Sequence, residues 1–182
     1  MTALPPCFKA YDIRGRVPAD LDAALARRIG LATARFLGAK TVAVGRDCRL
    51  SSSELAAAVT AGLTAGGADV LDIGLCGTEM IYHTTDRRGL DGGIMVTASH
   101  NPMDHNGMKL VRSEARPISG DTGLHEIGAM AAGGDLPEAA TPGRVTEADV
   151  RDAYVADLLG FVDTGALKPL KIVANGGNGC AG

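Results

Sequence analysis

Short apolar runs alternate with helical patterns along this 182-residue chain, and this alternation limits the possible fold more than any other feature. Apolar residues recur with helical spacing from Leu21 to Phe36, and Gly38 is placed to end that helix. Residues 41–45 then have the composition of a buried strand. Because short connections between successive strands and helices require right-handed crossovers, the pattern predicts an α/β fold with a mostly parallel sheet.

The same alternation continues through the middle of the chain. Ser51 and Glu54 have the spacing of a capping box, which predicts the start of an Ala-rich helix. Strands are expected over residues 70–74 and 93–97 with a helix over 78–88 between them. An antiparallel strand over 108–111 and a helix over 125–132 follow. Together these elements predict three layers, α/β/α, around a mixed, mostly parallel sheet.

The last quarter of the chain predicts a division into two units. Residues 133–143 contain Pro and Gly and have the character of a linker. Thr146 and Asp149 are placed to cap a further helix, and residues 170–174 predict another strand. We therefore expect one domain over residues 1–143 and the truncated beginning of a second, similar domain over residues 144–182.

Charge and composition exclude several classes of partner. A formal net charge of −3, no Trp, and only three Phe and three Tyr argue against nucleic acid. No apolar stretch approaches the roughly 20 residues of a membrane span, so no membrane partner is expected. The N-terminal residues lack the regions of a signal peptide, and the four cysteines form no Cys-x-x-Cys pair. These features favour a cytoplasmic protein without a zinc site and leave its oligomeric state open.

The loop after residues 93–97 concentrates groups that could carry chemistry. These are Ser99, His100, Asn101, His105 and Lys109. A serine hydroxyl attacks phosphorus or carbonyl carbon only if a base accepts its proton, and either histidine could do so, with Lys109 or Arg14 holding an anion. Asn-Pro and Asn-Gly are also common turn dipeptides, so residue types alone favour an ordinary turn. Because Ser99 lacks the Gly-x-Ser-x-Gly context, an esterase is not favoured.

Two other segments follow predicted strands, where α/β sheets bind ligands. Arg46 and Arg49 lie in the first, and by default such arginines are solvated or paired with Asp47 or Glu54. Glycines at 177, 179 and 182 match the Gly-x-Gly-x-x-Gly dinucleotide fingerprint, without the helix and acidic residue that would support it. A dinucleotide site and a stand-alone anion-binding module therefore remain alternatives.

Taken together, these segments resemble the alpha-D-phosphohexomutase superfamily, and within it the bacterial phosphomannomutases. The matching stretches include residues 8–15 (FKAYDIRG), 44–51, 77–82 (GTEMIY) and 91–123, which holds the sequences TASHNP and NGMK. The similarity runs in register over essentially the whole chain. Glu79 stands where many relatives have proline, and the phosphomannomutase subgroup shares this glutamate.

The resemblance implies a chemistry for the Ser99 loop. Ser99 would be a phosphoserine that exchanges its phosphoryl group with a small-molecule sugar phosphate, interconverting mannose 6-phosphate and mannose 1-phosphate through a hexose 1,6-bisphosphate. His100 and Asn101 match the adjoining loop residues, and Tyr11 matches a tyrosine beside the site. Arg14 and Lys109 match cations that flank the phosphoserine and assist proton transfer. They would offset the roughly −1.5 to −2 charge of a phosphoserine.

The resemblance also implies Mg²⁺, with the phosphate on Ser99 as one ligand, and a role in GDP-mannose synthesis. The family's Asp-rich Mg²⁺ loop, sugar-specificity loop and distal phosphate loop have no counterpart in this sequence. We therefore expect no mutase turnover from this chain by itself. A phosphoglucomutase of the same superfamily is the related alternative.

Overall fold

The computed structural model describes residues 3–177, in which one mixed sheet has the strand order β1-β5-β4-β2-β3-β6. The strands are β1 (Ile13–Arg16), β2 (Thr41–Arg46), β3 (Asp69–Leu75), β4 (Gly92–Val96), β5 (His105–Arg112) and β6 (Val145–Glu147). Strand β2 is parallel to β3 and β4, and β3 is parallel to β6. Strand β5 is antiparallel to both β4 and β1. The predicted mixed, mostly parallel sheet is therefore confirmed, although β1 was not expected as a strand.

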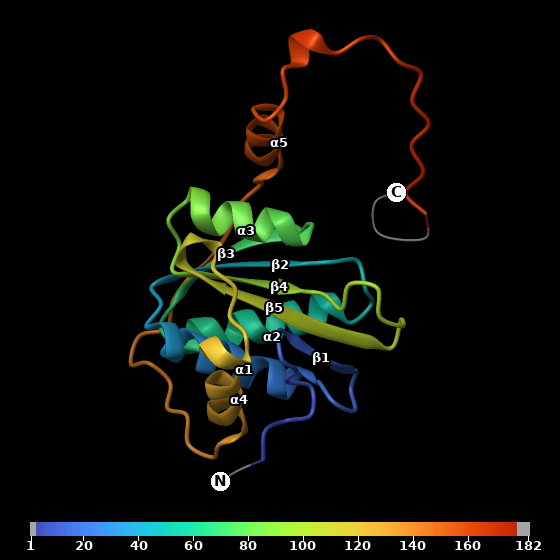
Figure 1. The fold of residues 1–182 in the computed structure, drawn as a ribbon. Helices are drawn as coiled ribbons and strands as arrows, with labels where there is room; N and C mark the ends of the chain where they lie inside the picture. The colour runs from blue at the N-terminus through green and yellow to red at the C-terminus, as the bar shows by residue number, and fades with distance from the viewer. Residues whose placement is uncertain (1–2, 178–182) are drawn as a thin grey trace.

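Helices cover both faces of this sheet (Figure 1). The helices are α1 (Ala23–Leu37), α2 (Ser52–Ala65), α3 (Thr78–Arg87), α4 (Leu124–Ala132) and α5 (Arg151–Leu159), with short 3₁₀ turns at Ser113–Ala115, Gly120–Thr122 and Thr164–Ala166. Helices α1, α2 and α4 lie on one face, and α3 lies on the other with α5 beyond it. This arrangement confirms the three-layer α/β/α prediction. Within residues 3–177, no helix is both long and apolar enough to cross a membrane.

Alternating side chains of the strands fill an apolar core on each face of the sheet. Val42 and Val44 of β2 pack in the larger cluster beneath α1, α2 and α4, whereas Ala43 packs on the opposite side with Ile81 of α3. Helices α1 and α2 approach closely at Gly30, where a Cβ would collide with the backbone of α2.

The helix ends follow local chemistry, with one correction. The Asp22 side chain accepts a hydrogen bond of 2.7 Å from the Leu25 N–H, and Gly38 ends α1 with a φ of 57°, as predicted. Helix α2 begins after Ser51, but the Ser51 hydroxyl does not cap it. That hydroxyl instead accepts from Asn106 Nδ2 at 2.8 Å, so the capping-box interpretation was wrong.

The segment after α4 first lies along the sheet and then leaves it. The N–H of Gly143 donates to Thr64 O at 2.9 Å, and β6 adds a parallel edge strand beside β3. Thr146 therefore lies in a strand and caps no helix. Asp149 accepts from the Arg151 N–H at 2.9 Å, but the N-cap of α5 is Val150 and no side chain caps it, so the two predicted caps were wrong. Residues 170–174 form no strand, which corrects that prediction. Ile172 is 80% exposed, and without a neighbouring strand its backbone has no ladder to join.

Candidate active site

Ser99 lies in the loop between β4 and β5, at the carboxyl edge of the parallel strands. Its side chain is exposed, and its φ of 54° lies in the left-handed region that residues other than glycine rarely adopt. The Ser99 hydroxyl lies 3.2 Å from Nδ1 of His100. The site therefore presents a hydroxyl beside a group that can accept its proton.

Of the two candidate histidines, the structure pairs only His100 with Ser99. His105 begins β5, and its Nδ1 lies 2.8 Å from Asp104 Oδ1. The hydrogen bond with His105 lowers the pKa of the exposed Asp104 carboxyl. His105 is thus engaged with a neighbouring carboxylate, which leaves His100 as the candidate base.

A buried carboxylate holds the two predicted cations of the site together. Arg14 in β1 and Lys109 in β5 lie on adjacent antiparallel strands. Asp12 Oδ2 accepts from Arg14 Nε at 2.8 Å and from Lys109 Nζ at 3.0 Å, and Asp12 is only 6% exposed. Two positive charges against one negative charge leave a net positive charge beside the loop. Sequence reasoning missed Asp12, although it stands inside the matched stretch FKAYDIRG.

Arg14 connects this cation pair to the Ser99 loop. Its Nη1 donates to Asn101 Oδ1 at 3.1 Å, and Asn101 lies two residues beyond Ser99. Asp12 therefore joins Arg14 to Lys109, and Arg14 joins both to Asn101. Tyr11 lies next to Asp12 along the chain with its side chain 82% exposed, and its contact with a substrate stays a prediction.

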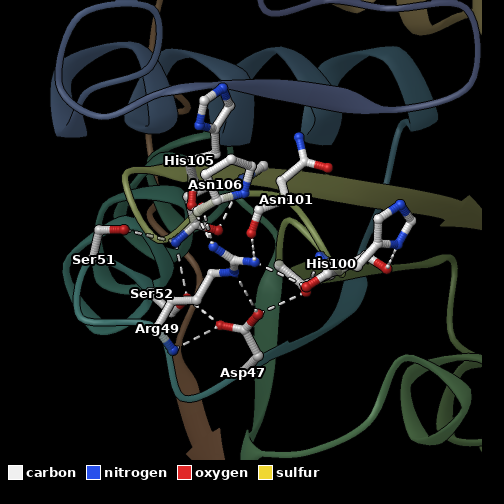
Figure 2. A network of polar contacts seen from close by, with 12 residues as sticks. Asp47, Arg49, Ser51, Ser52, His100, Asn101, His105 and Asn106 are labelled. Atoms are coloured by element: carbon white, nitrogen blue, oxygen red, sulfur yellow. Dashed lines mark hydrogen bonds and ion pairs between the residues drawn. The ribbon is translucent and has the colours of Figure 1, made fainter. Parts of the chain in front are cut away.

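Arg49, from the segment after β2, lies beneath the loop and binds its backbone (Figure 2). Its two terminal nitrogens donate to the carbonyls of Ser99 at 2.9 Å, Asn101 at 2.6 Å, Pro102 at 2.7 Å and His105 at 3.0 Å. Its Nε lies 3.5 Å from Asp47 Oδ2, and its side chain is only 14% exposed. The expected pairing with Asp47 is confirmed, whereas the alternative of a solvated arginine is wrong at this position.

Asp47 also reaches the other side of Ser99 through a threonine. The Thr97 hydroxyl donates to Asp47 Oδ2 at 2.7 Å and accepts from the Ser99 N–H at 2.9 Å. The second Asp47 oxygen accepts from the Ser52 hydroxyl at 2.5 Å and from the Arg49 N–H at 3.0 Å. Both backbone polar groups of Ser99 are thereby tied to the segment after β2.

Asn106 joins the same network through the two serines at the start of α2 (Figure 2). It is fully buried, and its Nδ2 donates to the hydroxyls of Ser51 at 2.8 Å and Ser52 at 2.9 Å. Asn106 and Gly107 lie within β5, so the interpretation of this Asn-Gly pair as a turn was wrong. Gly107 is required because a Cβ there would collide with the carbonyl oxygen of Ile13 on the adjacent β1.

The remaining candidates are a metal site, His83 and the glycine-rich fingerprint. Among residues 3–177, no three His, Cys, Asp or Glu side chains lie together in a way that could hold a metal ion. His83 contacts Asp157 Oδ2 at 2.8 Å and packs edge-on against Tyr154, so it joins α3 to α5. Of the glycine-rich fingerprint, positions 179 and 182 lie outside the described residues.

Comparisons with known proteins show the family of this chain. Residues 6–136 match the family described as phosphoglucomutase/phosphomannomutase, alpha/beta/alpha domain I. The chain is 54% identical over 178 residues to a phosphomannomutase of Salmonella typhimurium, covering 97% of this chain and 39% of that protein. A Xanthomonas campestris protein named phosphohexose mutases is 55% identical over 181 residues, covering 97% and 40%.

A solved structure shows the same similarity in three dimensions. The crystal structure of a phosphoglucomutase/phosphomannomutase family protein from Burkholderia thailandensis matches with a TM-score of 0.73 and 38% identity. The match covers 88% of this chain and 36% of that one. This chain thus spans about two fifths of the length of the curated relatives it matches.

Proposed function

The chain belongs to the phosphoglucomutase/phosphomannomutase family, and from this premise we propose that it carries the phosphoserine of a mutase that interconverts mannose 6-phosphate and mannose 1-phosphate. One observation carries the proposal. Ser99 presents an exposed hydroxyl 3.2 Å from an imidazole nitrogen, in a loop that Arg49 binds and that a second arginine contacts through Asn101. Mannose is favoured over glucose because the relatives in the curated comparison include proteins named phosphomannomutase.

In the proposed reaction, two phosphoryl transfers pass through Ser99. First, the bond between phosphorus and Ser99 Oγ breaks as phosphorus bonds to a hydroxyl oxygen of the hexose phosphate, giving a hexose 1,6-bisphosphate. The sugar hydroxyl gives its proton to water, and Ser99 Oγ takes one from protonated His100. After the intermediate reorients, Ser99 Oγ attacks the other phosphoryl group and returns its proton to His100 Nδ1. The bond from that phosphorus to the sugar oxygen breaks, and that oxygen takes a proton from water.

Arg14 and Lys109 serve the proposed reaction by balancing charge. Together with Asp12 they contribute a charge of about +1 next to the loop. A phosphoserine adds roughly −1.5 to −2, so the local charge becomes about −0.5 to −1. Phosphoryl transfer depends mainly on such charge neutralisation and on positioning. The salt bridges to Asp12 hold both cations in place before the phosphoryl group is present.

Mg²⁺ enters the proposal in one respect only. A phosphate oxygen on Ser99 would serve as one ligand, but residues 3–177 bring together no three carboxylate, imidazole or thiol groups for the remaining ones. The described part of the chain therefore does not fit a Mg²⁺ site of its own, and no step is assigned to the ion here. Within the same proposal, Tyr11 contacts the sugar phosphate, and residues 144–182 open a second domain after the one over 1–143.

The test is the mass of the gene product from its own cells, with peptide mapping across Ser99. Supporting the proposal requires a population heavier by one phosphoryl group, located on Ser99. An unmodified Ser99, together with a melting temperature that rises with added sugar phosphate, would instead support a non-catalytic binding module. The chain of 182 residues assayed by itself is expected to show no mutase turnover.

A further inference from the structure

We propose that Arg49 and Asp47 are positioning residues for Ser99. They would hold the serine backbone in the conformation that presents its hydroxyl for phosphoryl transfer, without contacting the phosphoryl group. This inference rests on the proposed role of Ser99 and deepens it. It concerns the segment after β2. From the sequence alone, Arg49 in this segment was expected only to be solvated or ion-paired.

The conformation of Ser99 requires an external support. A left-handed φ in a residue other than glycine is unfavourable and persists only where the surrounding structure dictates it. Ser99 has a φ of 54°, and its exposed side chain supplies little packing. Its backbone polar groups supply the restraint instead, because Asp47 fixes the N–H through Thr97 and Arg49 fixes the carbonyl.

The guanidinium of Arg49 can bind several backbone carbonyls of the Ser99 loop at once. It donates four hydrogen bonds to carbonyls spread over residues 99–105, and Asp47 orients it from the other side. A planar group with five N–H donors can hold several carbonyls in fixed directions. A lysine ammonium at this position would carry the same charge but would have only three rotatable donors.

The charges of the two ion-paired groups near Ser99 indicate different roles. Arg14 and Lys109 share one carboxylate, so that cluster retains a net positive charge. Arg49 and Asp47 pair one to one and contribute almost no net charge. Since the loop is exposed, water could also have satisfied its carbonyls. A neutral pair that replaces water at four carbonyls therefore acts by placing the backbone, and small misplacements of reacting atoms can slow a reaction about a hundredfold.

The experiment compares arginines that bind backbone carbonyls at two places. Arg49→Lys and Asp47→Asn alter the proposed support, while Arg28→Lys alters an arginine that binds the carbonyls of Ala131 and Gly133 at the end of α4. Each variant of the gene product at its native length is mixed with glucose 1,6-bisphosphate, and phosphorylation of Ser99 is followed by mass spectrometry. We expect Arg49→Lys to lower the maximal rate at least about tenfold with little change in half-saturation. Asp47→Asn should follow in the same direction, and Arg28→Lys should stay close to the wild type.

Amide exchange over residues 98–105 provides the second measurement. It should become faster in Arg49→Lys and Asp47→Asn and remain unchanged in Arg28→Lys, at similar melting temperatures. Equal phosphorylation rates in all four proteins would overturn the positioning role and leave the phosphoserine intact. If the wild type takes up no phosphoryl group, the proposed function fails instead. In that case, unchanged exchange in the Arg49 and Asp47 variants would overturn the positioning role as well.

Discussion

The Ser99 loop and the segment after α5 are both exposed and irregular, yet different bonds hold them. Arg49 contacts the Ser99 loop from 50 to 56 residues away in the sequence. In the described residues 161–177, the hydrogen bonds join groups only two or three positions apart. The comparison teaches that neither exposure nor irregular backbone indicates whether a segment is fixed to the rest of the fold. A segment is fixed when its hydrogen-bond partners lie far away in the sequence.

The sheet explains why one segment has distant partners and the other does not. Strands β2 and β4 are neighbours, with Arg46 opposite Val96, so the segments that follow them meet at one edge. Bringing Arg49 to the Ser99 loop then requires no additional closure of a long chain segment. Residues 161–177 follow α5, which contacts the remainder of the structure mainly through α3. No comparable edge is available to them among the described residues.

The largest effect is expected from removing the hydroxyl of Ser99. Ser99→Ala should abolish phosphoryl uptake from glucose 1,6-bisphosphate, because no other atom of the loop would replace the acceptor oxygen. Ser53→Ala, at an exposed serine in the first turn of α2, is the matched control and should retain full uptake. The readout is the intact mass of each protein. Continued uptake by Ser99→Ala would show that the loop is held for another reason.

A second experiment separates the packed sheet from the segment after α5 by using two isoleucines. Ile94 in β4 is fully buried, whereas Ile172 is 80% exposed. Ile94→Ala should lower the free energy of unfolding by about 2–5 kcal/mol because it leaves a cavity. Ile172→Ala should change it by less than about 0.5 kcal/mol. Urea unfolding measures both, and a comparable loss in the two variants would mean that residues 170–174 are packed in solution.

The sequence predicted elements better than it predicted partners. The sequence pattern located a helix at each of α1 to α5, although the side-chain caps predicted for α2 and α5 did not form. It failed at residues 170–174 because an apolar run does not reveal whether a neighbouring strand exists to pair with it. It also failed at Asn106, where the Asn-Gly pair is typical of turns but the adjacent β1 required the glycine.

The candidate site shows the same limit. The position of His100 beside Ser99 could be predicted because the two residues are adjacent in the chain. Residue types alone suggested Lys109 or Arg14 as the group that holds an anion, and the family resemblance implied that both flank the phosphoserine. Asp12, Asp47 and Arg49 were missed as site residues because their roles depend on the strand order β1-β5-β4-β2, which brings together residues 50 to 97 positions apart. Local sequence patterns do not specify that order.

A smaller effect should follow from breaking one link in the loop. Thr97→Val keeps the shape of the side chain but removes the hydroxyl between Asp47 and the Ser99 N–H. The loss of a buried hydrogen bond costs about 1–2 kcal/mol, so the Ser99 amide should exchange roughly 5–30 times faster. Thr164→Val, in the 3₁₀ turn after α5, is the control and should change exchange only locally. An unchanged Ser99 amide in Thr97→Val would show that Arg49 alone holds the loop.

The smallest expected effect concerns two aspartates that accept hydrogen bonds from backbone N–H groups. Asp91 Oδ2 accepts from Lys40 at 2.8 Å and from Thr41 at 2.9 Å, about 50 residues away. Asp163 Oδ1 accepts from Gly165 at 3.0 Å, only two residues away. Asp91→Asn should therefore lower the free energy of unfolding by about 1 kcal/mol at pH 7. Asp163→Asn should leave it unchanged.

The pH dependence identifies the cause of this difference. Partial burial raises the pKa of Asp91, but the hydrogen bonds from Thr41 and Lys40 outweigh burial, and the pKa is lowered from its ordinary 3.8. A carboxyl whose pKa is lower in the folded state stabilises that state above its unfolded pKa and loses this contribution as pH falls through the folded pKa. The gap between wild type and Asp91→Asn in urea unfolding should thus be constant from pH 7 to about 5 and shrink below pH 4. The prediction is contradicted if the difference in unfolding free energy between wild type and Asp91→Asn is undiminished at pH 3. The charge of the Asp91 carboxylate would then not be what stabilises the contact between the start of β2 and the start of β4.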